Sequence, residues 1–190
     1  MLLEVEHLTK RFGGLIAVDD LDMSVDEGEL LGLIGPNGAG KTTVFNLITG
    51  IHAPTRGTIT FAGRDITRIR PHEAAALGIG RTFQLAPCFA DFTVEENVSV
   101  AFHFHPRSRV RDMYFNTRKY RNNEKYIANK TLDILRLVGL EGVISESAKN
   151  QPHGYQKMLG VARALATQPR LLLLDEPLGG MNPSEIAFCL

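Results

Sequence analysis

The sequence predicts an α/β fold whose core is interrupted by a helical insertion at about residues 86–155. Three observations support this prediction. Segments in the first third alternate between apolar and polar side chains, as half-buried strands do. Continuous apolar runs at residues 30–34 and 171–174 are typical of strands that are buried on both faces of a sheet. Between these two runs, the middle of the chain changes to helical periodicity.

Apolar spacing and turn residues place the individual elements. The strands are predicted at residues 2–7, 17–25, 30–34, 58–61 and 171–174. The helices are predicted at residues 43–49, 71–77, 127–137 and 157–167, with another that opens at 182–184. Pro71 suits a first helical turn, and Gly78 and Gly139 follow helix ends. Thr93 and Glu96 fit a capping box that opens one more helix.

Composition excludes several classes of protein. Lys plus Arg and Asp plus Glu both number 21, so the net charge is zero, whereas a protein that coats nucleic acid is usually strongly basic. The two cysteines, Cys88 and Cys189, allow neither a disulfide framework nor a zinc site and favour a reducing cytosol. No apolar run reaches the 18 or more residues of a membrane span, so we expect any membrane role to depend on a partner.

A glycine-rich loop follows the apolar run at residues 30–34. It matches the phosphate-binding P-loop pattern at every fixed position, through Gly35, Pro36, Asn37, Gly38, Ala39, Gly40, Lys41 and Thr42. In this pattern backbone N–H groups surround phosphate oxygens, Lys41 reaches the β- and γ-phosphates, and the Thr42 hydroxyl binds Mg²⁺. The next helix adds its positive N-terminal end. Chance produces the pattern in roughly one such chain in a hundred, and less often between a strand and a helix.

Two acidic residues, Asp175 and Glu176, directly follow the apolar run at residues 171–174. An α/β sheet places its ligand chemistry at such strand ends. Asp175 suits Mg²⁺, directly or through water, and Glu176 suits polarising an attacking water. Taken alone, the pattern is more typical of a strand that ends at the surface. The P-loop makes the functional interpretation the better one.

With its motifs in this order, the chain resembles the ATP-binding subunits of ABC transporters over essentially its whole length. Phe12 matches the aromatic residue that stacks on adenine in that family, although a Phe near a strand end is ordinarily a core or surface residue. Gln84, in the sequence GRTFQ, matches the Q-loop glutamine, which meets Mg²⁺ and water and links the core to the helical insertion.

Residues 151–156 align with the signature loop of the same family, which contacts the γ-phosphate held by the other protomer of a dimer. Gly154 is retained, whereas Pro152, His153 and Tyr155 replace the usual Ser, Gly and Gln. The Tyr155 change either weakens the contact across the dimer or is compensated by Gln156. We interpret His153 as a polar loop residue without a catalytic role.

The resemblance implies the roles of the site residues. The catalytic residues are Glu176, Lys41 and Gln84. The nucleotide is bound by Phe12, Gly154 and the loop residues Gly35, Pro36, Asn37, Gly38, Ala39, Gly40, Lys41, Thr42 and Thr43. Mg²⁺ is held by Thr42, Gln84 and Asp175. The cofactors are then ATP and Mg²⁺.

The resemblance also implies partners and a location. The partners are transmembrane permease subunits, a second ATP-binding subunit that is identical or related, and indirectly a substrate-binding protein, with no nucleic acid. The location is cytoplasmic, on the inner face of the cell membrane. The basic stretch at residues 103–130 is then either a solvated face or a contact with lipid headgroups or acidic loops of the partner. Nucleic acid ranks last for this stretch.

The implied architecture is one nucleotide-binding domain with an N-terminal antiparallel β subdomain. Its ATP-binding core comprises residues 1–85 and 156–190, and its helical subdomain residues 86–155. The family's switch histidine is expected about 30 residues after Glu176, yet all six His precede Asp175. We therefore expect a chain that is C-terminally truncated, lacks a central strand, and has low stability and little ATPase activity by itself.

Three segments resemble the ATPases of branched-chain amino-acid importers in particular: residues 12–15, 80–84 and 93–98. Relatives that serve urea import or lipopolysaccharide export remain alternatives, since other chains select the solute. A non-catalytic remnant that binds nucleotide or a partner is a further alternative. A P-loop GTPase is less favoured, because the nearest guanine-reading motif, at residues 129–132, lacks its Asp.

Overall fold

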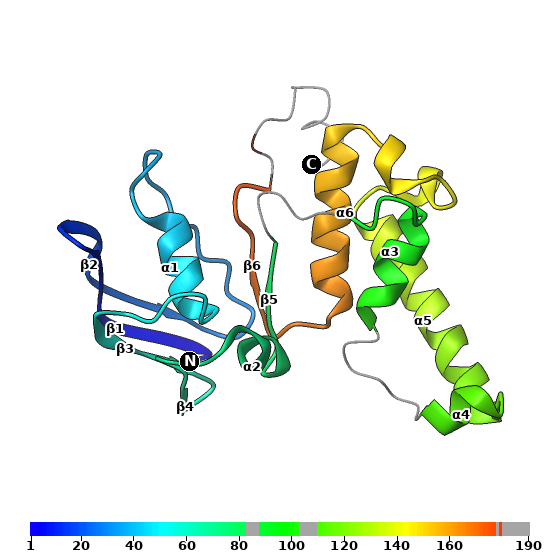
Figure 1. Cartoon of the computed structure of the whole chain (residues 1–190), viewed down its shortest axis with the longest axis horizontal. Helices are drawn as coiled ribbons and strands as arrows, with labels where there is room; N and C mark the ends of the chain where they lie inside the picture. The colour runs from blue at the N-terminus through cyan, green and yellow to red at the C-terminus, as the bar shows by residue number, and fades with distance from the viewer. Residues whose placement is uncertain (83–87, 103–109, 178, 180–190) are drawn as a thin grey trace. The chain divides into compact units, whose positions relative to one another are not determined.

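The computed structural model describes residues 1–82, 88–102, 110–177 and 179 (Figure 1). The chain divides into two compact units, Met1–Ile79 and Gly80–Leu190, which we call unit 1 and unit 2. The predicted helix at residues 182–184 and the candidate Gln84 lie outside the described residues.

Unit 1 contains an antiparallel sheet with the strand order β2-β1-β3-β4. Its strands are β1 (Leu3–Phe12), β2 (Leu15–Val25), β3 (Arg56–Phe61) and β4 (Arg64–Asp65). Leu3 pairs with Val25 on one side and with Phe61 on the other, so β1 is the central strand of this pairing. The strands predicted at residues 2–7, 17–25 and 58–61 are confirmed, and β1 extends five residues further.

Two helices accompany this sheet, α1 (Lys41–Ile48) and α2 (Pro71–Ala76). Helix α1 contacts β2 and buries Val44, Leu47 and Ile48. On the sheet, Leu8 and Ile59 are fully buried as well. Both helices were predicted, and Pro71 occupies the first turn of α2 as expected. The apolar residues of α1 and the sheet therefore give unit 1 a core of its own.

The prediction of a buried strand at residues 30–34 is wrong. Leu30 and Ile34 are 96% and 95% exposed, and the segment has no strand geometry. A parallel strand requires hydrogen-bonded neighbours, and in the described part of the chain no sheet includes this segment. An apolar run has the composition of a buried strand, but composition does not supply the partner strands.

Unit 2 combines a short strand pair with a bundle of helices (Figure 1). Strands β5 (Ile79–Arg81) and β6 (Leu171–Leu173) form a two-stranded sheet. The helices are α3 (Val94–Ala101), α4 (Val110–Tyr114), α5 (Arg118–Leu137), α6 (His153–Ala166) and the short 3₁₀ turns η2 (Glu141–Val143) and η3 (Ala148–Asn150). The strand at residues 171–174 is confirmed except for its last residue.

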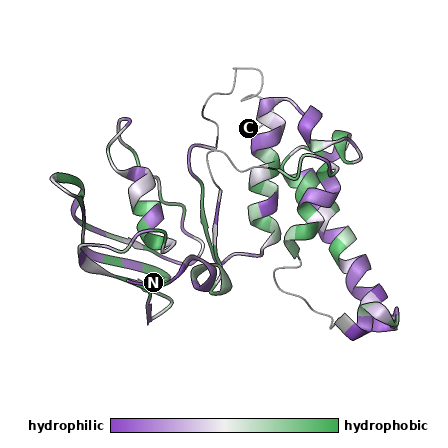
Figure 2. Cartoon of the chain, viewed as in Figure 1, coloured by the Kyte–Doolittle hydropathy of each residue, from purple (hydrophilic) through white to green (hydrophobic). Residues whose placement is uncertain are grey.

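Helices α3, α5 and α6 pack on one another around a cluster of buried apolar side chains, which we call the helical cluster. Its members are Val94, Val98, Phe102, Ile127, Leu135, Leu140, Ala148, Met158, Leu159, Ala162 and Ala166. The predicted helices at residues 127–137 and 157–167 are confirmed, but α5 begins nine residues earlier and α6 four residues earlier. In Figure 2 the early turns of α5 are largely hydrophilic, which explains why apolar periodicity did not detect them.

Candidate nucleotide-binding site

The loop at residues 35–43 is shaped by two glycines with left-handed backbone. Gly38 has φ +82° and Gly40 has φ +87°, conformations that side chains other than glycine rarely adopt. A Cβ atom on Gly40 would lie 2.2 Å from the carbonyl oxygen of Ala17 in β2. Gly40 is therefore required both by its conformation and by the close approach of β2, which positions the loop at the start of α1.

The side chain of Lys41 closes this loop. Its Nζ donates hydrogen bonds to the carbonyl oxygens of Gly35, at 2.6 Å, and Pro36, at 2.9 Å. The N-terminus of α1 has no side-chain cap and no acidic residue in its first turn. An ammonium group and a helix N-terminus thus meet in one loop, an arrangement that favours a bound phosphate. The loop fits a polyphosphate.

Phe12, the candidate adenine platform, lies at the end of β1 and is 43% exposed. The His52 ring packs edge-on against it, with 5.3 Å between centroids. Lys10 Nζ lies 4.9 Å from the Phe12 ring centre and donates to the carbonyl oxygen of Ala53 at 2.7 Å. Both neighbours hold the ring while part of its surface stays open for stacking. Sequence reasoning assigned no role to His52 or Lys10.

The second group of candidates lies in unit 2, at the end of β6. The Asp175 carboxylate accepts a hydrogen bond from Arg81 at 3.1 Å, and these side chains are only 6% and 5% exposed. Thr82 adds two bonds: its N–H donates to the Leu173 carbonyl, and its hydroxyl accepts from the Asp175 N–H. Arg81, at the end of β5, and Thr82, directly after it, therefore fix the carboxylate and the backbone of Asp175.

Glu176 differs from Asp175 in exposure and in backbone conformation. Glu176 is exposed, and its φ of +46° lies in the left-handed region, which residues other than glycine rarely adopt. Such strained conformations cost about 1–3 kcal/mol and cluster at functional sites. The two adjacent carboxylates consequently have different surroundings, one buried against an arginine and one facing outward.

Gly154 is buried in the first turn of α6, which begins at His153 after Pro152. This helix also lacks a side-chain cap and an acidic residue in its first turn. Tyr155 packs against the helical cluster, and the Gln156 side-chain amide donates to the Gln151 carbonyl oxygen at 2.9 Å. The unusual Tyr155 thus contributes to packing, and Gln156 bonds within its own loop.

Further along α6, Arg163 lies over the Phe89 ring, 5.1 Å from its centre. Burial lowers the pKa of its guanidinium from the usual value.

These candidates fall into two groups, each within one unit. Phe12 and residues 35–43 belong to unit 1, whereas Gly154, Asp175 and Glu176 belong to unit 2. Sequence reasoning missed Arg81 as the partner of Asp175, because no local signal links residues that lie 94 positions apart.

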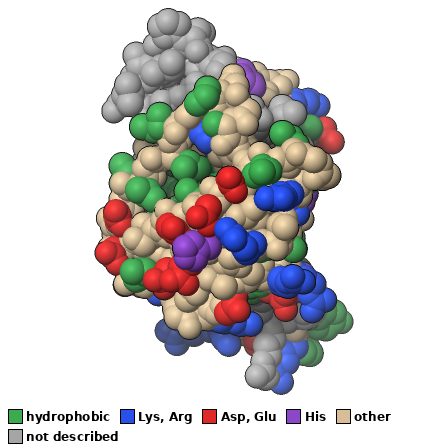
Figure 3. All heavy atoms as spheres, turned by 90° about the vertical axis from the view of Figure 1, so that its left-hand side faces the viewer, with side chains coloured by type: hydrophobic (Ala, Val, Ile, Leu, Met, Phe, Trp, Pro, Cys, Tyr) green, Lys and Arg blue, Asp and Glu red, His purple; other side chains and the backbone are tan. Residues whose placement is uncertain are grey.

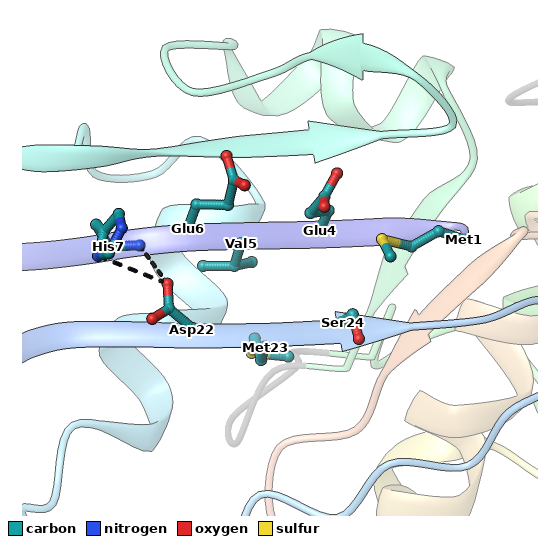
Figure 4. A pocket seen from close by; sticks show the side chains of 8 residues that line it. All are labelled: Met1, Glu4, Val5, Glu6, His7, Asp22, Met23 and Ser24. Atoms are coloured by element: carbon teal, nitrogen blue, oxygen red, sulfur yellow. Dashed lines mark hydrogen bonds and ion pairs between the residues drawn. The ribbon is translucent and has the colours of Figure 1, made fainter.

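Unit 1 also carries a shallow surface groove of about 510 Å³, which no motif predicted (Figure 4). Its lining residues are Met1, Glu4, Val5, Glu6, His7, Asp22, Met23 and Ser24. The His7 N–H donates to Asp22 at 2.6 Å, and Asp20 bridges the His7 ring and Arg56. On the face shown in Figure 3, acidic and basic side chains are interspersed around a His. Among the described residues, no His, Cys, Asp and Glu are grouped as a metal ion would require.

The sequence profile of the family described as ABC transporter matches residues 18–179 of this chain. The chain belongs to the ABC transporter family. It is therefore an ATP-binding protein and an ATPase. None of the described helices combines the length and the apolar character that crossing a bilayer requires.

The similarity extends to individual relatives. The chain is 41% identical to the high-affinity branched-chain amino acid transport ATP-binding protein BraF of Pseudomonas aeruginosa, covering 97% of this chain and 72% of BraF. It is 39% identical to LivG of Escherichia coli K12, with the same coverage. An ATP-binding cassette of an ABC transporter, solved in its ADP conformation, matches with a TM-score of 0.77 and 30% identity, covering 98% of this chain and 73% of that one. These matches confirm the ABC ATPase fold that the motifs predicted.

Proposed function

We propose that this ABC ATPase binds ATP through the loop at residues 35–43 and hydrolyses it to power the import of branched-chain amino acids through a membrane permease. The observation that carries the proposal is the loop itself, in which Lys41 and the uncapped N-terminus of α1 converge. Import of these solutes is supported by the 41% and 39% identity to BraF and LivG.

Each candidate residue then has a physical role. When a phosphate enters the loop, Lys41 exchanges its bonds to the Gly35 and Pro36 carbonyls for phosphate oxygens. Phe12 stacks on the adenine ring, and the N–H groups at Gly38, Ala39 and Gly40 surround the phosphates. Thr43, in the first turn of α1, belongs to the same N-terminus. Glu176 accepts a proton from the attacking water.

The donor set fits a magnesium ion. Thr42 offers a hydroxyl and Asp175 a carboxylate, and such hard oxygen ligands are those that Mg²⁺ prefers. When bound, Mg²⁺ neutralises the charge that develops on the phosphates. The third candidate ligand, Gln84, lies outside the described residues. Arg81 pairs with the Asp175 carboxylate at 3.1 Å and holds it in one orientation.

The proposal includes an arrangement of domains and partners. Residues 1–85 and 156–190 form the ATP-binding core, and residues 86–155 the helical subdomain. Met158 and Leu159 of α6 belong to the helical cluster, so α6 packs against the helical subdomain. The subunit works on the inner face of the membrane, as a dimer with a second ATP-binding subunit. The dimer acts on permease subunits, to which a substrate-binding protein delivers the solute.

ATP binding and phosphate release test the proposal in three variants. Lys41→Ala removes the loop ammonium, and we expect ATP to bind at least tenfold more weakly. Glu176→Gln keeps binding but lowers turnover by roughly 10²–10⁴-fold, since the general base is lost. Lys130→Ala, an exposed lysine of α5, is the matched control and changes neither.

The outcomes separate the alternatives. ATP binding without turnover in the unaltered chain would favour a non-catalytic remnant. Equal competition by GTP would contradict recognition of adenine by Phe12. The substrate assignment is tested by a transport assay in which this chain replaces LivG. Transport of another solute in place of branched-chain amino acids would overturn the assignment.

A further inference from the structure

The first part of α5 projects beyond the helical cluster. The buried residues of this 20-residue helix are Ile127, Thr131 and Leu135, and none lies N-terminal to Ile127. Residues 118–125 contain no buried side chain, and α4 packs against this end of the helix (Figure 1). We call residues 110–125 the α4–α5 arm. Packing in the helical cluster does not account for this arm, so we consider what the arm contacts.

The tip of this arm exposes three consecutive apolar side chains. Met113, Tyr114 and Phe115 are 62%, 83% and 73% exposed. The two rings pack edge to face, with centroids 5.1 Å apart. Large apolar side chains that gather on a surface mark sites of interaction with a protein or a membrane.

The turn that carries these side chains is hydrogen-bonded throughout. The Phe115 N–H donates to the Arg111 carbonyl at 3.1 Å, and the Thr117 N–H to that of Asp112 at 3.0 Å. The Thr117 hydroxyl caps α5 by accepting from the Tyr120 N–H. The exposure of the rings is therefore a feature of an ordered turn.

Basic side chains surround this apolar tip. The exposed basic residues of the arm are Arg111, Arg118, Lys119, Arg121 and Lys125. Only two acidic residues, Asp112 and Glu124, lie in the same segment. The chain as a whole has no net charge, so this positive field is local to the arm.

From this combination we propose that the tip of the α4–α5 arm docks on the surface of an anionic lipid bilayer. The Tyr114 and Phe115 rings enter the headgroup region, where aromatic side chains partition favourably. Arg118 and Lys119 pair with lipid phosphates or carboxylates, and their alkyl stems follow the apolar tip. A projecting tip suits a deformable lipid surface better than a shaped protein pocket.

A single tryptophan tests the position of the tip. The sequence has no Trp, so Phe115→Trp of the full chain contains a single tryptophan, whose emission can be excited selectively beside the tyrosines. With vesicles of phosphatidylcholine and phosphatidylglycerol, we expect its emission to shift to the blue and brominated lipid to quench it. Leu137→Trp is the matched control: Leu137 is 75% exposed on the same helix, at its far end, and its emission should not change.

A pair of charge variants tests the electrostatic part. Arg118→Gln with Lys119→Gln removes two charges at the tip, and vesicle binding should fall by roughly tenfold or more. Lys130→Gln with Arg136→Gln removes two exposed charges from the second half of α5 and should have a much smaller effect. Added salt should likewise weaken the binding of the unaltered chain to anionic vesicles.

Three results would overturn the proposal: no blue shift of Phe115→Trp on anionic vesicles, equal losses from the two charge pairs, or equal binding to vesicles of pure phosphatidylcholine. A shift produced by single-stranded RNA or an acidic peptide, but not by vesicles, would also reject the lipid surface. The assay contains no nucleotide, so its failure leaves the proposed ATPase function unaffected.

Discussion

At the scale of single residues, Gly40 shows how strongly a position in the loop is constrained. Gly40→Ala places a methyl group against the Ala17 carbonyl oxygen in a left-handed conformation. We expect the free energy of unfolding to fall by about 2–4 kcal/mol. Gly38→Ala is the control, since Gly38 has the same φ sign but no atom within 4 Å of its Cβ position. It should cost only about 1–2 kcal/mol. Equal losses in urea unfolding would show that the contact with β2 is unimportant.

The buried pair of Arg81 and Asp175 gives a second prediction at this scale. Arg81→Met leaves the Asp175 carboxylate without its arginine in a site that is 6% exposed. We expect the free energy of unfolding to fall by about 3–5 kcal/mol. Adding Asp175→Leu removes the uncompensated charge, and the double variant should recover most of that loss. Urea unfolding of both variants measures this, and a double variant as unstable as the single one would contradict the pairing.

Gly40 and the partner of Asp175 also mark the limit of what could be predicted about the site from the sequence. Gly40 could be predicted because the P-loop is a local pattern, and its chemistry depends on residues that follow one another. The partner of Asp175 could not, because Arg81 reaches it only after β5 and β6 have paired.

At the scale of elements, the helix start that carries a capping signal was predicted correctly, whereas the strand at residues 30–34 was not. Thr93 and Glu96 form the expected capping box, with reciprocal hydrogen bonds of 3.1 and 2.8 Å at the start of α3. The ends of a helix are set by side chains close in sequence, so such signals can be read locally. The strand predicted at residues 30–34 failed because strands form only through partners elsewhere in the chain.

The cap of α3 provides the prediction at this scale. Thr93→Ala removes the hydroxyl that accepts from the Glu96 N–H, and the free energy of unfolding should fall by about 1 kcal/mol. Thr93→Ser keeps this hydroxyl and should stay near the unaltered value. Urea unfolding followed by circular dichroism measures both. If the two variants lost the same stability, the methyl group of Thr93 and not its cap would matter.

At the scale of the whole molecule, the catalytic candidates are distributed over two units with separate cores. The loop that binds phosphate belongs to unit 1, whereas the acidic strand end and the start of α6 belong to unit 2. Hydrolysis as proposed needs groups from both units, so the activity is a property of the full chain. The uncapped N-terminus of α6 lies in unit 2, and in the proposed dimer it faces a nucleotide that another subunit holds.

That arrangement predicts dimerisation that depends on ATP and on the N-terminus of α6. The Glu176→Gln variant keeps its bound ATP because it hydrolyses it slowly. This variant should therefore form dimers with ATP and remain monomeric without it. His153 is exposed in the first turn of α6, where an acidic residue favours the helix dipole. His153→Asp should therefore keep or raise stability while repelling the partner's γ-phosphate, and dimerisation should weaken by roughly tenfold or more. His153→Asn, which is neutral, separates charge from loss of the imidazole. Analytical ultracentrifugation decides: unchanged dimers in His153→Asp would mean that no phosphate approaches this helix.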